Sequence, residues 1–127
     1  MKCLIDTHTF LWFVLADSRL SAKARELIGI SEIVYVSPAS YWEIGIKISL
    51  GKYLLPEPFA EFMERELNQN DFTILPITIA HASKISKLPF HHRDPFDRMM
   101  VAQSLVENVP LLSCDEILDD YGVIRIW

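Results

Sequence analysis

Four acidic side chains stand where a folded chain can bring them together. Asp6 directly follows the apolar run KCLI, and Asp115 follows the apolar run LLSC. Glu43 lies about two turns into a predicted helix, and Asp97 lies in the first turn of another. Carboxylates about 4 Å apart repel each other by roughly 4 kcal/mol at an effective dielectric of about 20. A cluster of four therefore needs a cation, and Mg²⁺ or Mn²⁺, which favour oxygen ligands, are the natural partners.

Each acid also has a purely structural explanation. Asp6 is placed to cap the helix that follows it, and Asp97 follows the expected cap Asp94 at the spacing of a capping box. Glu43 precedes Lys47 by four residues, as in an exposed helical ion pair. The acid after LLSC is placed to cap a short helical turn. No single acid decides between structure and chemistry, so the prediction depends on whether all four meet.

Strands and helices alternate along the chain. The predicted strands are 2–5, 32–37, 72–77, 110–114 and 123–127. The predicted helices are 7–16, 21–28, 37–51, 58–67, 78–86 and 94–108. Near-continuous apolar strands between helices predict an α/β fold with a mostly parallel sheet covered on both faces. In such sheets, sites form beyond the carboxyl ends of the strands, which is where Asp6 and Asp115 fall.

Composition limits the class of protein. With 127 residues, half of them hydrophobic, the chain predicts one domain over residues 1–127. Cys3 and Cys114 lie in apolar runs, so we expect reduced, buried thiols and a cytoplasmic location. No leader peptide or membrane span is apparent. The net charge of −5 counts against simple electrostatic binding to nucleic acid, so any such role has to rest on a local metal site.

The four histidines do not form a zinc motif. His91 and His92 are adjacent in a loop near Pro89, and neither has a partner at zinc-ligand spacing. The two cysteines are not paired in sequence either. His8 is better explained as a residue of a helix start than as a catalytic base, and His81 is predicted to be structural.

Four segments of the chain resemble a known family. LIDTHTFLW, SPASYWEIGIKISLGK, HHRDPFDRMMVAQS and LLSCD occur in the order and at the separations found in the PIN-domain VapC toxins of bacterial toxin–antitoxin pairs. HHRDPFDR is close to the H-x-D-P-F-D-R pattern of one branch of that family. The likeness runs from the first predicted strand to the terminal tryptophan.

The resemblance implies a three-layer α/β/α sandwich and a metal-dependent ribonuclease. It places the catalytic and metal-binding acids on the four residues that the sheet argument had grouped, which are Asp6, Glu43, Asp97 and Asp115. It gives supporting places to Thr7 and Ser113, and Asp94 is expected to cap the last long helix. Arg93 and Arg98 flank that helix start and are candidates to contact substrate phosphate, although Arg98 is equally placed to pair with an acid.

The predicted reaction is hydrolysis of an RNA phosphodiester by metal-activated water. The resemblance also implies a cognate antitoxin and a homodimer. A basic rim is expected from Lys47, Lys52, Lys84, Lys87, Arg93 and Arg98. Surplus aromatic residues are candidates for an interface, among them Trp12, Phe13, Tyr53 and Phe59, whereas Trp42 is expected in the core.

Several alternatives remain open from the sequence. A PIN-like RNA-processing nuclease, or an RNA-binding module without a toxin role, has the same residues. A DNA-cleaving PIN relative is a further possibility. A haloacid dehalogenase-like phosphatase needs an acid two residues after Asp6, where His8 stands instead. A receiver-like signalling domain needs an aspartate after a middle strand and a lysine after a late one, and both are missing.

Overall fold

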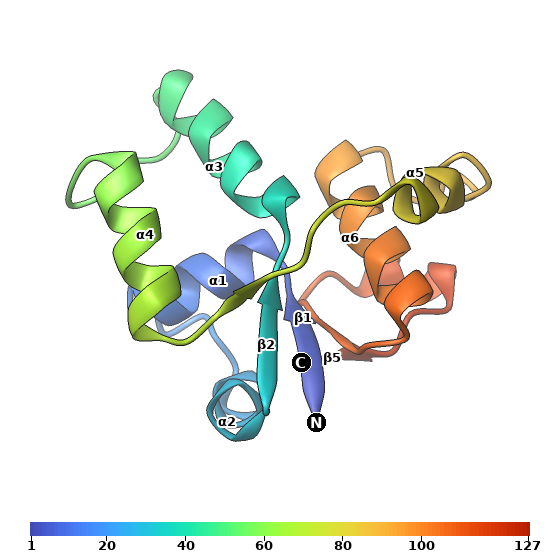
Figure 1. Ribbon diagram of the computed structural model, residues 1–127, viewed down its shortest axis with the longest axis horizontal. Helices are drawn as coiled ribbons and strands as arrows, with labels where there is room; N and C mark the ends of the chain where they lie inside the picture. The colour runs from blue at the N-terminus through green and yellow to red at the C-terminus, as the bar shows by residue number, and fades with distance from the viewer.

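The computed structural model describes all 127 residues and contains one five-stranded sheet of order β3-β2-β1-β4-β5. The central strand β1 spans Lys2–Ile5. On one side lie β2 (Ile33–Val36) and β3 (Thr73–Ile74), and on the other lie β4 (Leu111–Leu112) and β5 (Arg125–Ile126). Every neighbouring pair is parallel, as the alternation of strands and helices predicts. In Figure 1 strands β1 and β2 run upward, and the N-terminus lies at the foot of β1.

The central strand divides the core into two halves. Cys3 and Ile5 point to one face of the sheet and Leu4 points to the other, because successive side chains alternate along a strand. All three are fully buried. The strand pairs with β4 through Leu4↔Leu111 and Ile5↔Leu112, so the two faces stay in register across the sheet. A sheet buried on both sides forms the middle layer of the predicted three-layer α/β/α fold, which is confirmed.

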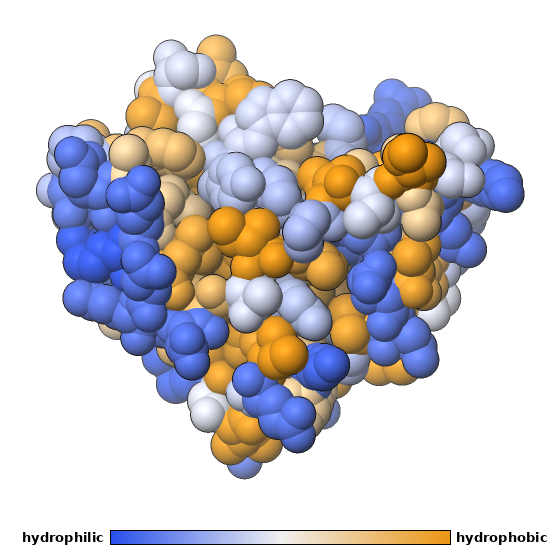
Figure 2. All heavy atoms as spheres, viewed as in Figure 1, coloured by the Kyte–Doolittle hydropathy of each residue, from blue (hydrophilic) through white to orange (hydrophobic).

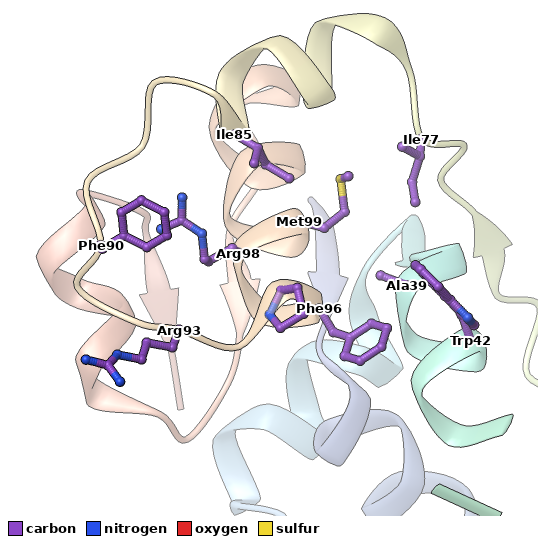
Figure 3. Close-up of a pocket in the computed structure, with 10 residues that line it drawn as sticks. Ala39, Trp42, Ile77, Ile85, Phe90, Arg93, Phe96, Arg98 and Met99 are labelled. Atoms are coloured by element: carbon purple, nitrogen blue, oxygen red, sulfur yellow. The ribbon is translucent and has the colours of Figure 1, made fainter. Parts of the chain in front are cut away.

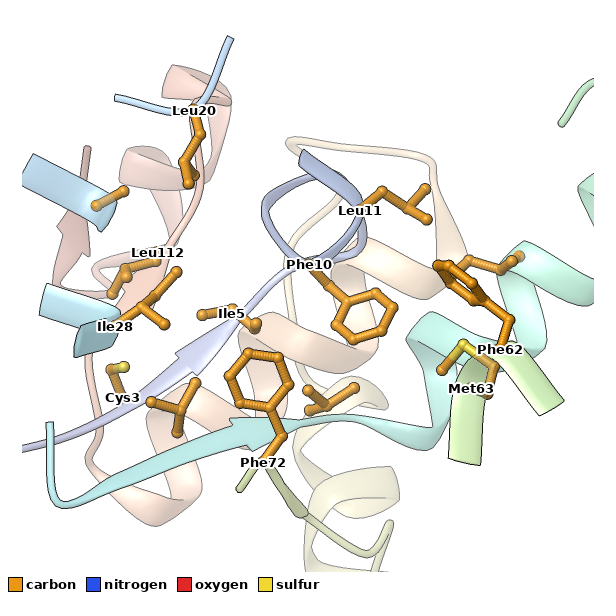
Figure 4. Packing of buried hydrophobic residues seen from close by; sticks show 14 residues of the cluster. Cys3, Ile5, Phe10, Leu11, Leu20, Ile28, Phe62, Met63, Phe72 and Leu112 are labelled. Carbon is orange, nitrogen blue, oxygen red and sulfur yellow. The ribbon is translucent and has the colours of Figure 1, made fainter. Parts of the chain in front are cut away.

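Four helices cover the first face of the sheet. They are α1 (Thr7–Val14), α2 (Ala22–Ile30), α3 (Pro38–Ser49) and α4 (Phe59–Gln69). Their apolar side chains meet those of the strands around Phe10, which is fully buried (Figure 4). The cluster comprises Cys3, Ile5, Phe10, Leu11, Leu20, Ala24, Ile28, Val34, Val36, Ile44, Phe62, Met63, Phe72 and Leu112.

Two helices and a 3₁₀ turn cover the second face. These are α5 (Ile79–Ile85), α6 (Pro95–Glu107) and η1 (Glu116–Tyr121). Helices α5 and α6 pack side by side, and α6 also contacts α3 across the upper edge of the sheet (Figure 1). The core on this face comprises Leu4, Leu75, Leu88, Met100, Val101, Ala102, Val109, Leu111, Leu118, Tyr121 and Val123.

Local chemistry explains where the helices begin. Ser21, Ser37, Thr78 and Asp94 each stand just before a helix, and each side chain accepts a hydrogen bond from a backbone N–H of the first turn. These caps agree with the predicted helix starts. Gly51, with φ of 73°, ends the segment after α3 in the left-handed conformation that glycine adopts without strain.

Strands β3 and β4 are shorter than predicted. Strand β3 has two residues where six are expected, and β4 has two where five are expected. Pro76 has no backbone N–H to offer, so pairing cannot continue along the expected segment at 72–77. Helix α1 also ends at Val14, two residues earlier than predicted, and Ala16 takes a left-handed conformation with φ of 53°.

Two burial predictions are wrong. Trp42 is 63% exposed, because the buried face of α3 is formed by Ala39, Ser40, Glu43 and Ile44, and Trp42 lies off that face. Cys114 is exposed, because it follows the last paired residues of β4 and enters the loop beyond the sheet. Cys3 is buried, as expected.

The surface is mixed in polarity. Figure 2 shows hydrophilic side chains gathered over α4 and apolar side chains across the middle of the same face. Isolated large apolar residues such as Phe90 and Ile79 are strongly exposed. No helix of the chain has the length and apolar character that spanning a membrane requires.

Candidate active site

The candidate site lies where the strand order reverses. From the central strand β1, the chain adds β2 and β3 on one side and then returns to place β4 on the other. The crevice beyond the carboxyl ends of β1 and β4 is therefore the switch point at which α/β sheets bind ligands. Asp6 stands at the end of β1, and Ser113 and Asp115 follow β4.

Asp6 is both a helix cap and a member of the site. Its Oδ1 accepts a hydrogen bond of 2.9 Å from the backbone N–H of Thr9, and the side chain is buried. The Thr9 hydroxyl in turn donates to the carbonyl of Leu112 at 3.0 Å, which ties the start of α1 to β4. Burial raises the pKa of Asp6, and hydrogen bonds from Ser113 and Thr9 offset only part of that rise.

Glu43 enters the site from the buried face of α3. Its Oε2 pairs with Lys47 Nζ at 3.0 Å, one turn along the helix, as the sequence alternative predicts. Its Oε1 is buried and has no hydrogen-bond partner. An unpaired buried oxygen of a charged group costs about 1–3 kcal/mol or more. The structural explanation therefore accounts for one oxygen of this carboxylate and leaves the other open to a cation.

The pKa of Asp97 reflects the other acids of the cluster. Its backbone N–H donates to Oδ1 of the cap Asp94 at 3.0 Å, and this fixes the first turn of α6. Burial raises the pKa of Asp97 to about 8, and the charges of Asp94, Asp6, Glu43 and Asp115 add to the rise. The four predicted acids, drawn from four separate elements, thus lie close enough to act on one another.

Asp115 is held by a histidine that sequence reasoning did not place in the site. Its Oδ1 accepts from the N–H of Ile117 at 3.1 Å and caps η1, while its Oδ2 lies 2.9 Å from His92 Nε2. His92 Nε2 is also 3.3 Å from Asp97 Oδ2. One imidazole therefore bridges two of the four acids.

The backbone decides how His92 makes that bridge. The N–H of Asp94 donates to His92 Nδ1 at 3.0 Å, so Nδ1 has to be the unprotonated nitrogen. The ring proton then sits on Nε2, and Nε2 donates to Asp115. Ligand atoms of His92, Asp97 and Asp115 lie within 4.8 Å of one another. In this tautomer, however, His92 is a hydrogen-bond donor to the acids and not a metal ligand.

The predicted supporting residues occupy separate places. Ser113 Oγ accepts from the N–H of Asp115 at 3.1 Å and shapes the turn after β4. The Thr7 hydroxyl donates to Ser40 Oγ at 3.2 Å, and Ser40 donates to Met100 Sδ at 3.4 Å. Thr7 thus joins α1, α3 and α6 beneath the site. Asp94 caps α6, the role expected for it.

Arg98 makes its hydrogen bonds to groups of the protein itself. It is buried, its Nη1 donates to the carbonyl of Pro89 at 2.7 Å and to the Tyr121 hydroxyl at 3.0 Å, and Phe90 covers the guanidinium at 4.1 Å. Arg98 thus has a structural role in fixing the 88–93 loop, and its predicted contact with a substrate phosphate stays a prediction. Arg93 is exposed on that loop.

A cavity of about 350 Å³ opens between α3 and α6 (Figure 3). Its walls are mostly apolar, and Trp42 meets Phe96 edge to face at a ring distance of 5.2 Å. None of the four acids lines it. Arg93 belongs to its rim and extends away from the apolar walls in Figure 3. This cavity suits an apolar partner better than a phosphate.

The donor set fits a hard divalent cation. All four candidate ligands are carboxylates, one of their oxygens is buried without a partner, and mutual repulsion raises the pKa of Asp97. A bound cation would accept the unpartnered oxygen as a ligand and would offset the repulsion among the carboxylates. Mg²⁺ and Mn²⁺ prefer such oxygen ligands, whereas zinc and copper favour the nitrogen and sulfur ligands that this cluster does not present.

An acidic cluster at the switch point of a parallel sheet defines the chain as an α/β protein suited to phosphoryl chemistry. The model of the PIN domain family matches residues 3–124, so the chain belongs to the PIN domain family, which is a family of nucleases. No curated protein matches the chain in sequence.

Solved structures with the same fold agree with this assignment. VapBC2 from Rickettsia felis, bound to a DNA fragment from its promoter, matches with a TM-score of 0.72, 11% identity, and coverage of 99% of this chain and 98% of that one. FitAcB from Neisseria gonorrhoeae matches with a TM-score of 0.71 and 17% identity, and the match covers 100% of this chain and 97% of that one. VapBC-5 from Mycobacterium tuberculosis, a member of the VapBC family of toxin–antitoxin systems, matches with a TM-score of 0.61 and 15% identity. The match covers 98% of this chain and 95% of that one. At these identities, the likeness shows the fold alone.

Proposed function

We propose that this PIN domain is a metal-dependent endoribonuclease and the toxin of a toxin–antitoxin pair. The observation that carries the proposal is the convergence of the four carboxylates, with Oε1 of Glu43 buried and without a partner, and this convergence contributes to the raised pKa of Asp97. Such a concentration of negative charge lowers stability unless it serves to bind a cation. The membership of the PIN family and the H-x-D-P-F-D-R pattern support the nuclease assignment.

Asp6, Glu43 and Asp97 are the proposed ligands of Mg²⁺ or Mn²⁺, and Asp115 completes the set. A divalent ion bound there polarises the scissile phosphate and lowers the pKa of bound water. His92 keeps the Asp115 carboxylate turned toward Asp97, so the two acids are oriented before the ion arrives. The unpaired Oε1 of Glu43 is available without breaking the Lys47 ion pair.

Water is the proposed nucleophile. Cys114 is the thiol beside the cluster, and partial desolvation and the Asp6 charge raise its pKa. A neutral thiol is a poor nucleophile at pH 7. Covalent catalysis by this residue is therefore disfavoured, and direct hydrolysis is the simpler route.

The proposed partners follow from the resemblance and from the solved complexes that share the fold. The similar structures VapBC and FitAB are each named as a pair of proteins, which supports a cognate antitoxin for this chain. The apolar cavity between Trp42 and Phe96 offers a protein partner a place to bury apolar area. A homodimer, a cytoplasmic location and an RNA substrate complete the proposal.

The test is cleavage of a mixed set of RNAs by the purified chain without antitoxin, in Mg²⁺, in Mn²⁺ and in EDTA. The variants are Asp97→Asn and a matched control, Asp120→Asn, which changes an exposed acid outside the cluster. Metal-dependent cleavage by wild type and control, lost in Asp97→Asn, supports the nuclease. Cleavage of single-stranded DNA alone favours a DNA-cleaving relative. No cleavage of any RNA, together with RNA binding, favours a binding module.

A further inference from the structure

A second cavity, of about 230 Å³, lies between α1 and the chain that follows α3. Its walls include His8, Trp12, Arg19, Lys52 and Tyr53, together with several leucines. The cavity therefore combines aromatic rings with basic side chains, unlike the apolar cavity beside Trp42. Its volume lies below the ~300–1,000 Å³ of pockets that enclose a whole drug-sized ligand. It has room for one flat ring system and not for an extended ligand.

The aromatic rings of this cavity support one another. His8 stacks on Trp12 with ring centroids 5.4 Å apart and an angle of 24° between the planes. The Tyr53 hydroxyl lies 3.4 Å from His8 Nε2 and holds the imidazole from its edge. Trp127 meets Trp12 edge to face at 5.8 Å. His8 is exposed, and Trp12 covers one of its faces, so a further ring would stack on the face opposite Trp12.

The charge of the cavity is opposite to that of the chain. Arg19 lies over the Trp12 ring at 5.0 Å, and Lys47 lies over the Tyr53 ring at 5.4 Å. Lys52 adds a third cation. Asp17 is the one acid in the wall, and it is already bonded to Arg19 at 2.7 Å. In a chain of net charge −5, this is a local site for an anion with an aromatic part.

The cavity borders the acidic cluster by two routes. His8 lies on α1 two residues after Asp6, the first predicted ligand. Lys47 lies over Tyr53 and pairs with Glu43 at 3.0 Å, so one side chain touches both the cavity wall and the cluster. The cavity and the acidic cluster are therefore neighbours, joined through the start of α1 and through Lys47.

We propose that this cavity binds one nucleobase of a single-stranded nucleic acid, beside the phosphate that the acidic cluster addresses. The base stacks on the face of His8 opposite Trp12, and Lys52 and Arg19 pair with a flanking phosphate. Stacking of a splayed base on an aromatic side chain is how proteins read single-stranded RNA. The inference deepens the proposed function, since it assigns the cavity to the substrate of the same site.

The experiment measures binding in EDTA, where no cleavage occurs, so it is independent of catalysis. Adenosine 5′-monophosphate is titrated into the chain and followed by NMR of the His8 and Trp12 rings. Ribose 5-phosphate and inorganic phosphate serve as probes without a base. We expect AMP to shift both rings and to bind more tightly than either control. His8→Ala should weaken AMP binding by about tenfold or more, and Ile79→Ala, a change of an exposed side chain on α5, should leave it unchanged.

A second variant tests the anion contact by a different readout. Lys52→Ala should lower the salt dependence of oligoadenylate binding by about 0.7 in the slope of log K against log salt, the value for one phosphate on a single strand. Equal binding of AMP and ribose 5-phosphate, or no effect of His8→Ala in a folded variant, would overturn the proposal. Tighter binding of an oligoglutamate peptide than of oligoadenylate would also overturn it, by assigning the cavity to an acidic protein partner. AMP binding by a chain that cleaves no RNA would retain the cavity and reject the nuclease.

Discussion

Two histidines of this chain have the same local arrangement and different surroundings. His81 Nδ1 accepts from the N–H of Thr78 at 3.0 Å, and its Nε2 lies 2.8 Å from Glu107. His92 Nδ1 accepts from the N–H of Asp94 at 3.0 Å, and its Nε2 lies 2.9 Å from Asp115. In both, a backbone N–H fixes the tautomer and the outer nitrogen donates to a carboxylate.

The two sites differ in the number of acidic side chains that surround the carboxylate. His81 is fully buried and meets one acid that is 39% exposed, so the pair joins α5 to the end of α6 without competing charge. His92 meets an acid that belongs to a cluster, and a second member lies 3.3 Å from the same nitrogen. The contact itself is alike in the two places. The charge around it decides whether the histidine joins two helices or prepares a site.

The largest effect is expected from reducing the charge around His92. Asp97→Asn leaves His92 with one charged acid, as His81 has, and removes a proposed metal ligand. Cleavage should fall by at least a thousandfold, about 4 kcal/mol of barrier, since outer partners of a metal site already contribute 10–100-fold. Initial rates at saturating Mg²⁺ measure it. Equal cleavage by the variant and wild type would leave Asp97 as a helix-cap neighbour only.

The same cluster should make metal-free stability depend on pH. Folding raises the pKa of Asp97 from 3.8 to about 8, so between these values the folded state holds a proton that the unfolded state has lost. Stability should therefore fall as pH rises through this window, by about 2–3 kcal/mol after allowing for the partial exposure of the side chain, and then level off. Urea unfolding in EDTA measures the slope. Asp97→Asn should reduce the slope, with the remainder due to Asp6, whose pKa burial also raises; an unchanged slope in the variant would assign it to other groups.

Exchanging each histidine for leucine tests the comparison directly. His92→Leu should weaken Mn²⁺ binding by about 10–100-fold, because an outer partner that orients ligands is lost. His81→Leu should leave Mn²⁺ binding unchanged and lower the free energy of unfolding by about 1–3 kcal/mol, because Glu107 and the Thr78 N–H lose their partner. Titration calorimetry and urea unfolding separate the two outcomes.

His92→Gln is the matched rescue for that experiment. Its side-chain amide can replace the Nε2 donor, so it should recover much of the Mn²⁺ affinity that His92→Leu loses. A loss in His92→Gln as large as in His92→Leu would mean that the imidazole itself binds the ion. That result would reject the tautomer assigned from the Asp94 N–H.

The smallest effect is expected at the two arginines beside the motif. Arg93→Ala changes an exposed residue and should alter the free energy of unfolding by less than about 0.5 kcal/mol. Arg98→Ala should cost more, about 1–3 kcal/mol, since the carbonyl of Pro89 and the Tyr121 hydroxyl lose a buried donor. Thermal melts of the two variants compare them. Equal stability would mean that the 88–93 loop, which carries His92, is not held by Arg98.

Sequence reasoning reached the elements and the four acids because both are encoded by local signals. Caps such as Ser37 and Asp94 mark helix starts, and an acid directly after an apolar strand has to emerge at the sheet edge. The burial of Trp42 and Cys114 was misjudged. Each depends on which way a side chain points against elements remote in sequence, and periodicity in one helix does not contain that information.

His92 was missed for a related reason. Its ring is oriented by a backbone N–H two residues away, a signal that lies within the motif itself. Its partner Asp115, however, lies 23 residues further along the chain, beyond α6 and β4. A histidine two residues before a capping aspartate is the pattern that would have identified it.

The position of β1 at the centre of the sheet has a consequence for how the chain matures. Asp6 is synthesised before Asp115, and Asp115 becomes its neighbour only after β4 has docked beside β1. Parallel pairing between such distant segments forms late, because closing the long loop between them costs entropy before any contact is gained. A ribosome-bound or truncated chain that lacks β4 therefore carries three of the acids and no complete site. The proposed toxin therefore cannot cut an RNA until β4 has been synthesised and has paired with β1.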